Sequence, residues 1–130
     1  MSANIIKINR GDCYSFMMSI EDESDPNNIY EFQPNDILYF ALLNPHDRFE
    51  DAIILRGYTY ADAKEVSTSI GTVHLFEIAL SRDDTKNLAP GVYYYTFKLQ
   101  KNAKSTALAF NEPNAQLTTV IERTKLIINE

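Results

Sequence analysis

The stretch "LAPGVYYYTFKLQ", Leu88 to Gln100, decides the fold because large apolar residues recur in it at the two-residue period of a β-strand. Residues two apart in a strand point to the same face of the sheet, so the three consecutive tyrosines are divided between two faces. One face receives Tyr93, Tyr95, Phe97 and Leu99, and the other receives Val92, Tyr94, Thr96, Lys98 and Gln100. The first set predicts a core stripe, with the hydroxyl of Tyr93 or Tyr95 bonded to backbone. Only Tyr94 remains a candidate for outward recognition.

The same alternation recurs in segments bounded by Asp, Asn, Pro and Gly, which predicts further strands. These segments are Asn4–Asn9, Cys13–Ile20, Asp36–Asn44, Ala52–Tyr58, Thr72–Leu80 and Gln116–Asn129. The segment Asp36–Asn44 is apolar on both faces, as in a central strand that is covered on both sides or lies at a subunit contact. Ser81 followed by Asp84 is a variant of the capping box and predicts one short helical turn. Thr59–Gly71 fits either a short helix or an irregular crossover.

About seven short strands, little helix and no βαβ alternation predict an all-β fold with antiparallel sheets. A chain of 130 residues, 45% hydrophobic and 23% charged, has the size and composition of one globular domain. We therefore expect a single domain over residues 1–130, built as an antiparallel immunoglobulin-like β-sandwich of about seven strands. A small closed barrel is the alternative.

The charge of the chain argues against several partners. The net charge of −6 opposes binding to the phosphates of nucleic acid or to an anionic membrane. We see no export signal in the opening residues, and no stretch approaches the roughly 20 apolar residues of a membrane span. Cys13 is the only cysteine, so an intramolecular disulfide is excluded, which fits synthesis in a reducing cytoplasm.

No residue pattern predicts catalysis, a cofactor or a metal site. His46 and His74 do not lie at a metal-ligand spacing from each other or from Cys13. The acidic run Glu21–Asp25 lacks the glycine and the terminal glutamate of an EF-hand, so a solvated loop is expected there and Ca²⁺ binding stays open. The four glycines form no phosphate-binding loop. We therefore expect a protein that is not an enzyme.

A long segment between the last two strands is the second candidate for binding. Asn102–Gln116 carries Leu108 and Phe110 among small residues, and loops of this length are often functional. The two side chains either anchor the loop to its own sandwich or contact a partner. The candidate partner-binding residues are Tyr94, Leu108 and Phe110.

The order of landmarks resembles the N-terminal immunoglobulin-like domain of phage baseplate upper proteins and related small tailed-phage virion proteins. The resemblance rests on "INRGD", on "DILYFALLN", and on "DDTKNLAPGVYYYTFKLQ" before the closing strand "LTTVIERTKLIIN". The family positions correspond here to Gly11, Asp12, Leu88, Gly91, Tyr93 and Tyr95.

The resemblance implies a structural subunit of a virion, in the baseplate, tail, neck or capsid-associated layer, made in the host cytoplasm. Its expected partners are other virion proteins and further copies of itself, because symmetric assemblies repeat one contact many times. The alternative function is a carbohydrate-binding module that uses the aromatic faces of Tyr58, Tyr60 and Tyr94.

Overall fold

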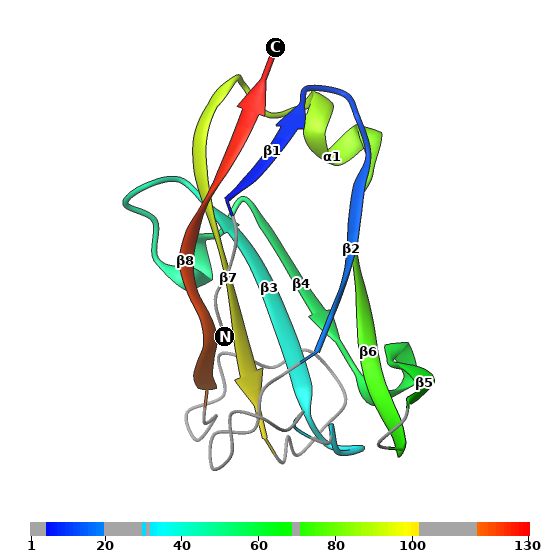
Figure 1. Ribbon diagram of the computed structural model, residues 1–130. Coiled ribbons are helices and arrows are strands. Elements are labelled where there is room, and N and C mark those ends of the chain that lie inside the picture. The colour runs from blue at the N-terminus through cyan, green and yellow to red at the C-terminus, as the bar shows by residue number, and fades with distance from the viewer. Residues whose placement is uncertain (1–4, 20–29, 31, 69–70, 102–116) are drawn as a thin grey trace.

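The computed structural model describes residues 5–19, 30, 32–68, 71–101 and 117–130, and these residues form two β-sheets (Figure 1). The larger sheet contains, in spatial order, β1 (Ile6–Asn9), β8 (Leu117–Asn129), β7 (Gly91–Gln100), β3 (Ile37–Leu43) and β4 (Ile54–Tyr58). The smaller sheet contains β2 (Tyr14–Met18), β6 (Gly71–Leu80) and β5 (Lys64–Thr68). The helical elements are α1 (Arg82–Lys86) and the 3-10 turns η1 (Phe49–Asp51) and η2 (Tyr60–Asp62). The all-β, two-sheet architecture is confirmed.

Each segment that alternation predicted as a strand contains one. The described residues form eight strands, and β5 is the one that was not predicted. It lies in Thr59–Gly71, where we expected a short helix or a crossover, and η2 precedes it. All residues of β5 whose burial is described are exposed, so its sequence has no buried face to reveal it. No helix in the described ranges has the length and apolar character of a membrane span.

The prediction that the sheets are antiparallel is wrong for one pair of strands. β1 runs parallel to β8, with Ile6 opposite Leu126 and Ile8 opposite Ile128, while the other strand pairs are antiparallel. The N–H of Arg10 donates to the carbonyl of Asn129, so the two strands end side by side. The chain then turns into β2 of the other sheet. Alternation fixes which face of a strand is buried, but it does not fix the direction of the neighbouring strand.

The main core lies between the two sheets and contains the predicted stripe of β7. Tyr93, Tyr95, Phe97 and Leu99 are buried, and the partners from β6 are Phe76, Ile78 and Leu80. The hydroxyl of Tyr93 donates to the carbonyl of Ala89 at 2.7 Å, which confirms the expected bond to backbone. This bond ties the start of β7 to the loop before it.

β3 is buried on both faces, as its sequence predicted. Leu38, Phe40 and Leu42 join the main core. The alternate residues form a second apolar cluster with Phe49 of η1, on the face of the five-stranded sheet that points away from the smaller sheet, and they are Ile37, Tyr39, Ala41 and Leu43. We call this face the outer face. The ring of Tyr39 lies 6.3 Å from that of Phe49, and its hydroxyl donates to Gln100.

The helix α1 fastens the turn between β1 and β2. The predicted capping box is present, because the Ser81 hydroxyl accepts from the Asp84 N–H and the Asp84 carboxylate accepts from the Ser81 N–H. Thr85 is fully buried. Its hydroxyl accepts from the N–H of Gly11 at 3.1 Å and donates to the carbonyl of Asp12 at 2.7 Å. Gly11 has a φ of 87°, a backbone angle that residues with a side chain rarely adopt. One hydroxyl therefore holds the turn that connects the two sheets.

Replacing Thr85 by valine keeps the volume of the side chain and leaves the Gly11 N–H without its buried acceptor. We expect the free energy of unfolding to fall by about 1–3 kcal/mol in urea denaturation. Thr85→Ser keeps the hydroxyl and is the control, with a smaller loss because only a methyl group is removed. A valine variant as stable as the wild type would contradict the role given to this hydroxyl.

Tyr93→Phe removes only the hydroxyl that bonds to Ala89. The expected cost is about 1 kcal/mol in the free energy of unfolding, measured by the same denaturation. Tyr94→Phe is the matched control, since Tyr94 is the next residue and lies on the opposite face of β7. Equal effects of the two substitutions would show that the Tyr93 bond does not stabilise the fold.

Candidate functional site

Of the three predicted partner-binding residues, Tyr94 lies in the described part of the chain, and Leu108 and Phe110 lie outside it. Tyr94 is half-buried on the outer face, between Leu43 of β3 and Lys125 of β8. In the next row, Val92 stands opposite Ile127. Val92 is 45% exposed, and Ile53, the residue before β4, is 41% exposed. The predicted placement of Tyr94 on the outer face is therefore confirmed, and Val92 and Ile127 are apolar residues in the adjacent row.

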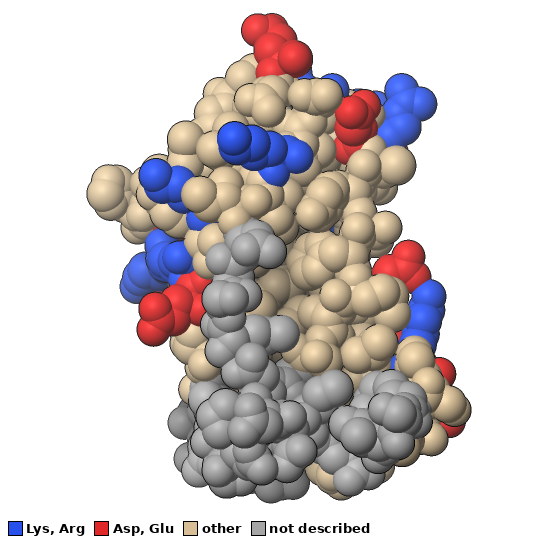
Figure 2. All heavy atoms as spheres, viewed as in Figure 1, with Lys and Arg blue, Asp and Glu red and all other residues tan. Residues whose placement is uncertain are grey.

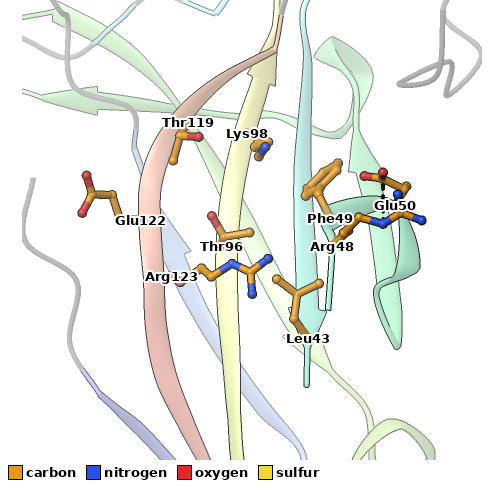
Figure 3. Close-up of a pocket in the computed structure, with 9 residues that line it drawn as sticks. All are labelled: Leu43, Arg48, Phe49, Glu50, Thr96, Lys98, Thr119, Glu122 and Arg123. Atoms are coloured by element: carbon orange, nitrogen blue, oxygen red, sulfur yellow. Dashed lines mark ion pairs between the residues drawn. The ribbon is translucent and has the colours of Figure 1, made fainter. Parts of the chain in front are cut away.

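A groove lies beside Tyr94 on the same face, between η1 and β8. It has a volume of about 510 Å³. Figure 3 shows the side chains that line it, which come from β3 and the η1 region (Leu43, Arg48, Phe49, Glu50), from β7 (Thr96, Lys98) and from β8 (Thr119, Glu122, Arg123). We refer to this set as the outer groove.

Two irregularities in the pairing of β7 with β8 shape the outer groove. The register shifts between Tyr95 and Phe97 and again between Phe97 and Lys98. In the first shift Glu122 and Arg123 both stand opposite the single residue Thr96. A β-bulge of this kind bends the strand and redirects its side chains, and it often lies next to a functional site. The bulges thus place consecutive charged residues of β8 along one wall of the groove.

The cations of the groove are held by different contacts. Arg48 forms ion pairs with Glu50 and Asp51 at its own wall. The Lys98 ammonium lies over the ring of Phe49, 4.8 Å from its centroid. Arg123 donates to the backbone carbonyl of Asp47. Within the described residues, Lys98 therefore contacts a ring and Arg123 a carbonyl, and neither forms an ion pair with a carboxylate.

The outer groove was not predicted from sequence, although Lys98 was placed on the correct face. Its walls come from residues near 48 and near 123, which alternation cannot bring together. One local signal exists, because Glu122 and Arg123 are consecutive charges inside an alternating strand and so interrupt its period. Such an interruption in a long strand indicates a bulge.

The three tyrosines of the carbohydrate-binding alternative do not form one platform. Tyr58 packs against the main core, with its ring 6.4 Å from Phe76. Tyr60 lies against His74, 5.2 Å between ring centroids. Tyr58 and Tyr94 stand opposite residues near the two ends of β3. Their rings are separated by most of the length of that strand.

His74 lies near the start of β6, opposite Glu65 of β5. Its side chain is 11% exposed and contacts Tyr60 and Glu65. His46 and Cys13 are exposed, and the acidic run Glu21–Asp25 lies outside the described residues. No group of three His, Cys, Asp or Glu side chains that could hold a metal ion occurs within the described ranges.

A second hollow, of about 410 Å³, contains an ion pair that links the two sheets. Arg56 of β4 donates to the carbonyl of Ala79 on β6 at 2.7 Å and to the carboxylate of Asp84 at 2.6 Å. Burial acts to raise the pKa of Asp84, but the hydrogen bonds from Arg56 and from the Ser81 N–H outweigh it and lower this pKa below its usual value. The role of this cluster is therefore structural, because Arg56 connects β4 to β6 and to α1.

No protein-family model matches the chain, and no curated protein matches it significantly.

Asp84→Asn keeps an acceptor for the capping bond and removes the charge that pairs with Arg56. A carboxyl group whose folded pKa is lowered stabilises the protein above its unfolded pKa of about 3.9, and this contribution is lost as the pH falls through the folded pKa. We expect a loss of about 1–2 kcal/mol at pH 7, with the difference from wild type narrowing below about pH 4. Urea denaturation at pH 7 measures the loss of stability, and the same experiment at pH 3 measures how far the difference from wild type has narrowed.

Asp83→Asn is the control for this substitution, because Asp83 is the adjacent residue and pairs with Lys86 at the exposed surface. Its effect should stay within about 0.5 kcal/mol. A difference between Asp84→Asn and wild type that is the same at both pH values would contradict the ion-pair explanation.

Proposed function

We propose that the chain is a structural subunit of a tailed-phage particle, with no enzymatic activity, that assembles through the outer face of its five-stranded sheet. The observation that carries the proposal is the set of exposed and half-buried apolar side chains on this face at the start of β7, which are Tyr94, Val92 and Ile127. Apolar patches on the surface of a domain mark contacts with other proteins. The virion assignment is supported by the resemblance of the sequence landmarks to those of phage baseplate upper proteins and related small virion proteins.

The finer fold within this proposal is the immunoglobulin-like sandwich. In spatial order, β2, β6 and β5 correspond to strands B, E and D, and β8, β7, β3 and β4 correspond to G, F, C and C′. The bond from Tyr93 to Ala89 at the start of β7 has the geometry of a tyrosine corner. β1 is the departure from the constant-type pattern, because it pairs with β8 and not with β2. The chain also has no tryptophan and a single cysteine, so it lacks the tryptophan and disulfide of antibody domains.

A structural role fits the composition of the outer face better than a catalytic one. Hydrogen bonds lower the pKa of Asp84 and burial raises the pKa of Tyr95, and neither residue lines the outer groove. Side chains that perform acid-base catalysis are usually perturbed inside a cleft with convergent polar groups. The apolar side chains of the outer face offer contact area to a protein partner. Other virion proteins and further copies of this chain are the proposed partners, within a homo-oligomer of the particle.

Val92→Glu places a carboxylate in the proposed contact and tests the proposal directly. Burying a charge without a partner is costly, so we expect the amount of chain in purified phage particles to fall at least about tenfold, with the melting temperature unchanged. Quantitative mass spectrometry of particles made with wild-type or variant chain gives the ratio.

Val66→Glu is the matched control, because Val66 is 36% exposed on the edge strand β5 of the other sheet. It should leave incorporation unchanged. If wild-type particles contain none of this chain, the proposal is wrong. Equal loss with both glutamate variants would show that the outer face is not the contact.

A further inference from the structure

We propose that the outer face, at the end where β7 begins, binds an acidic segment of a partner protein through a patch of three apolar and two basic side chains. The patch consists of Val92, Tyr94, Ile127, Lys7 and Lys125, and we call it the lysine patch. Acidic side chains of the partner pair with the two lysines, and an apolar side chain covers Val92 and Ile127. This inference rests on the proposed function and names the chemistry of the partner.

The pairing of three strands places these five side chains next to one another. Lys7 of β1 stands opposite Ile127 of β8, and Ile127 stands opposite Val92 of β7. Lys125, two residues before Ile127, stands opposite Tyr94. Residues that stand opposite each other, or two apart along one strand, share a face of the sheet and lie within about 8 Å of each other. The two lysines therefore flank Ile127, and Val92 and Tyr94 continue its apolar surface.

The side chains of the lysine patch are open to a partner. Val92 is 45% exposed, both lysines are exposed, and Tyr94 and Ile127 are half-buried. Neither of the two apolar clusters of the described residues includes Val92, Tyr94 or Ile127. Among the described residues, neither lysine forms an ion pair. A partner that covers the patch therefore displaces only water from these side chains.

The charge of the lysine patch is opposite to that of the chain as a whole. The chain carries 12 Lys and Arg against 18 Asp and Glu, but the charged members of the patch are both lysines. Figure 2 shows Lys and Arg side chains over the part of the molecule where β1 and β8 lie, with uncharged residues between them. Complementary charge across an interface selects the partner and speeds its association. The partner surface that complements the patch is therefore acidic.

The lysines disfavour two other occupants of the patch. In a symmetric face-to-face pair of copies, lysines would approach lysines, and like charges that face each other across an interface cost free energy. A nucleic acid needs a row of cations to release its counterions, and the net charge of −6 opposes its approach. The apolar side chains of the patch also offer nothing to a phosphate backbone. A protein segment with both acidic and apolar side chains matches both parts of the patch.

The spacing along β8 fits an extended segment. Lys125 and Ile127 are two residues apart in a strand, which separates them by about 7 Å, and an extended partner has the same spacing between its own residues i and i+2. A glutamate and a leucine two residues apart in the partner therefore face the sheet together. The glutamate then lies over Lys125 while the leucine covers Ile127 and Val92.

The test is an NMR titration of isotope-labelled protein with a peptide that repeats the unit Glu-Ser-Leu-Ser, and with the same peptide carrying Gln in place of Glu. We expect the Glu peptide to shift the amide signals of Val92, Lys125 and Ile127 in a saturable way. It should bind about fivefold more tightly than the Gln peptide, because two exposed ion pairs contribute modestly, and added salt should reduce this difference.

The double variant Lys7→Gln/Lys125→Gln should weaken binding of the Glu peptide about fivefold and leave binding of the Gln peptide unchanged. Lys64→Gln/Lys86→Gln is the matched control, because it removes the same charge from exposed lysines of β5 and α1 that already pair with Glu77 and Asp83. The control should bind the Glu peptide as the wild type does. The amide spectrum of each variant also shows whether it is folded.

Several outcomes would overturn the inference. These are the absence of saturable shifts, shifts that map to another surface, equal affinity of the wild type for the Glu and Gln peptides, and an equal loss in the two double variants. Tighter binding of a single-stranded oligonucleotide to the same amides would assign the patch to nucleic acid. Dimerisation that becomes stronger in Lys7→Gln/Lys125→Gln, measured by light scattering, would assign it to a symmetric contact between copies.

The outcomes also separate this inference from the proposed function. Absence of peptide binding, with the chain present in particles, removes only the acidic partner. Peptide binding that depends on Lys7 and Lys125, with the chain absent from particles, leaves the lysine patch as a peptide site and removes the virion role.

Discussion

The burial of one face of β7 is the constraint on which the rest of the structure depends. β7 is hydrogen-bonded to β3 on one side and to β8 on the other, so its rotation sets both neighbours. Because Tyr93, Tyr95, Phe97 and Leu99 must leave water together, the intervening residues are forced onto the outer face. A shift of one residue would exchange the two sets and place Lys98 in the core. The position of Tyr94 and of the outer groove therefore follows from burial on the opposite face.

Polar contacts of three side chains hold the sheets in place around this core, and no intramolecular disulfide can contribute. Tyr93 ties β7 to its preceding loop, Thr85 holds the turn from β1 to β2, and Arg56 reaches from β4 to β6 and α1. These contacts join a loop to a strand, the helix to a turn, and one sheet to the other. Each contact also gives a partner to a backbone or charged group, and leaving such a group without a partner would cost free energy. α1 takes part in two of them, so this short helix connects both layers at one end of the molecule.

The outer face is divided between a covered apolar cluster and a part that stays exposed. Phe49 covers the centre of β3 and removes Tyr39 and Leu43 from solvent. Toward Val92 and Ile53 that cover is incomplete, and apolar side chains stay exposed. On the side of β8, next to the bulges, lies a groove lined by charged side chains of both signs. Exposed apolar side chains and charged side chains thus lie next to each other on this face.

Local sequence determined the strands and their buried faces, because the two-residue period depends only on the chain itself. It also determined the capping box of α1, the Tyr93 bond to backbone and the double burial of β3. It could not predict β5, which has no buried face, or the parallel direction of β1. Of the candidate site it identified Tyr94, and it missed the groove formed by Arg48, Phe49 and Arg123. Those residues meet only in the tertiary structure, because the pairing of β8 with β7 and the folding of η1 over β3 bring distant segments together.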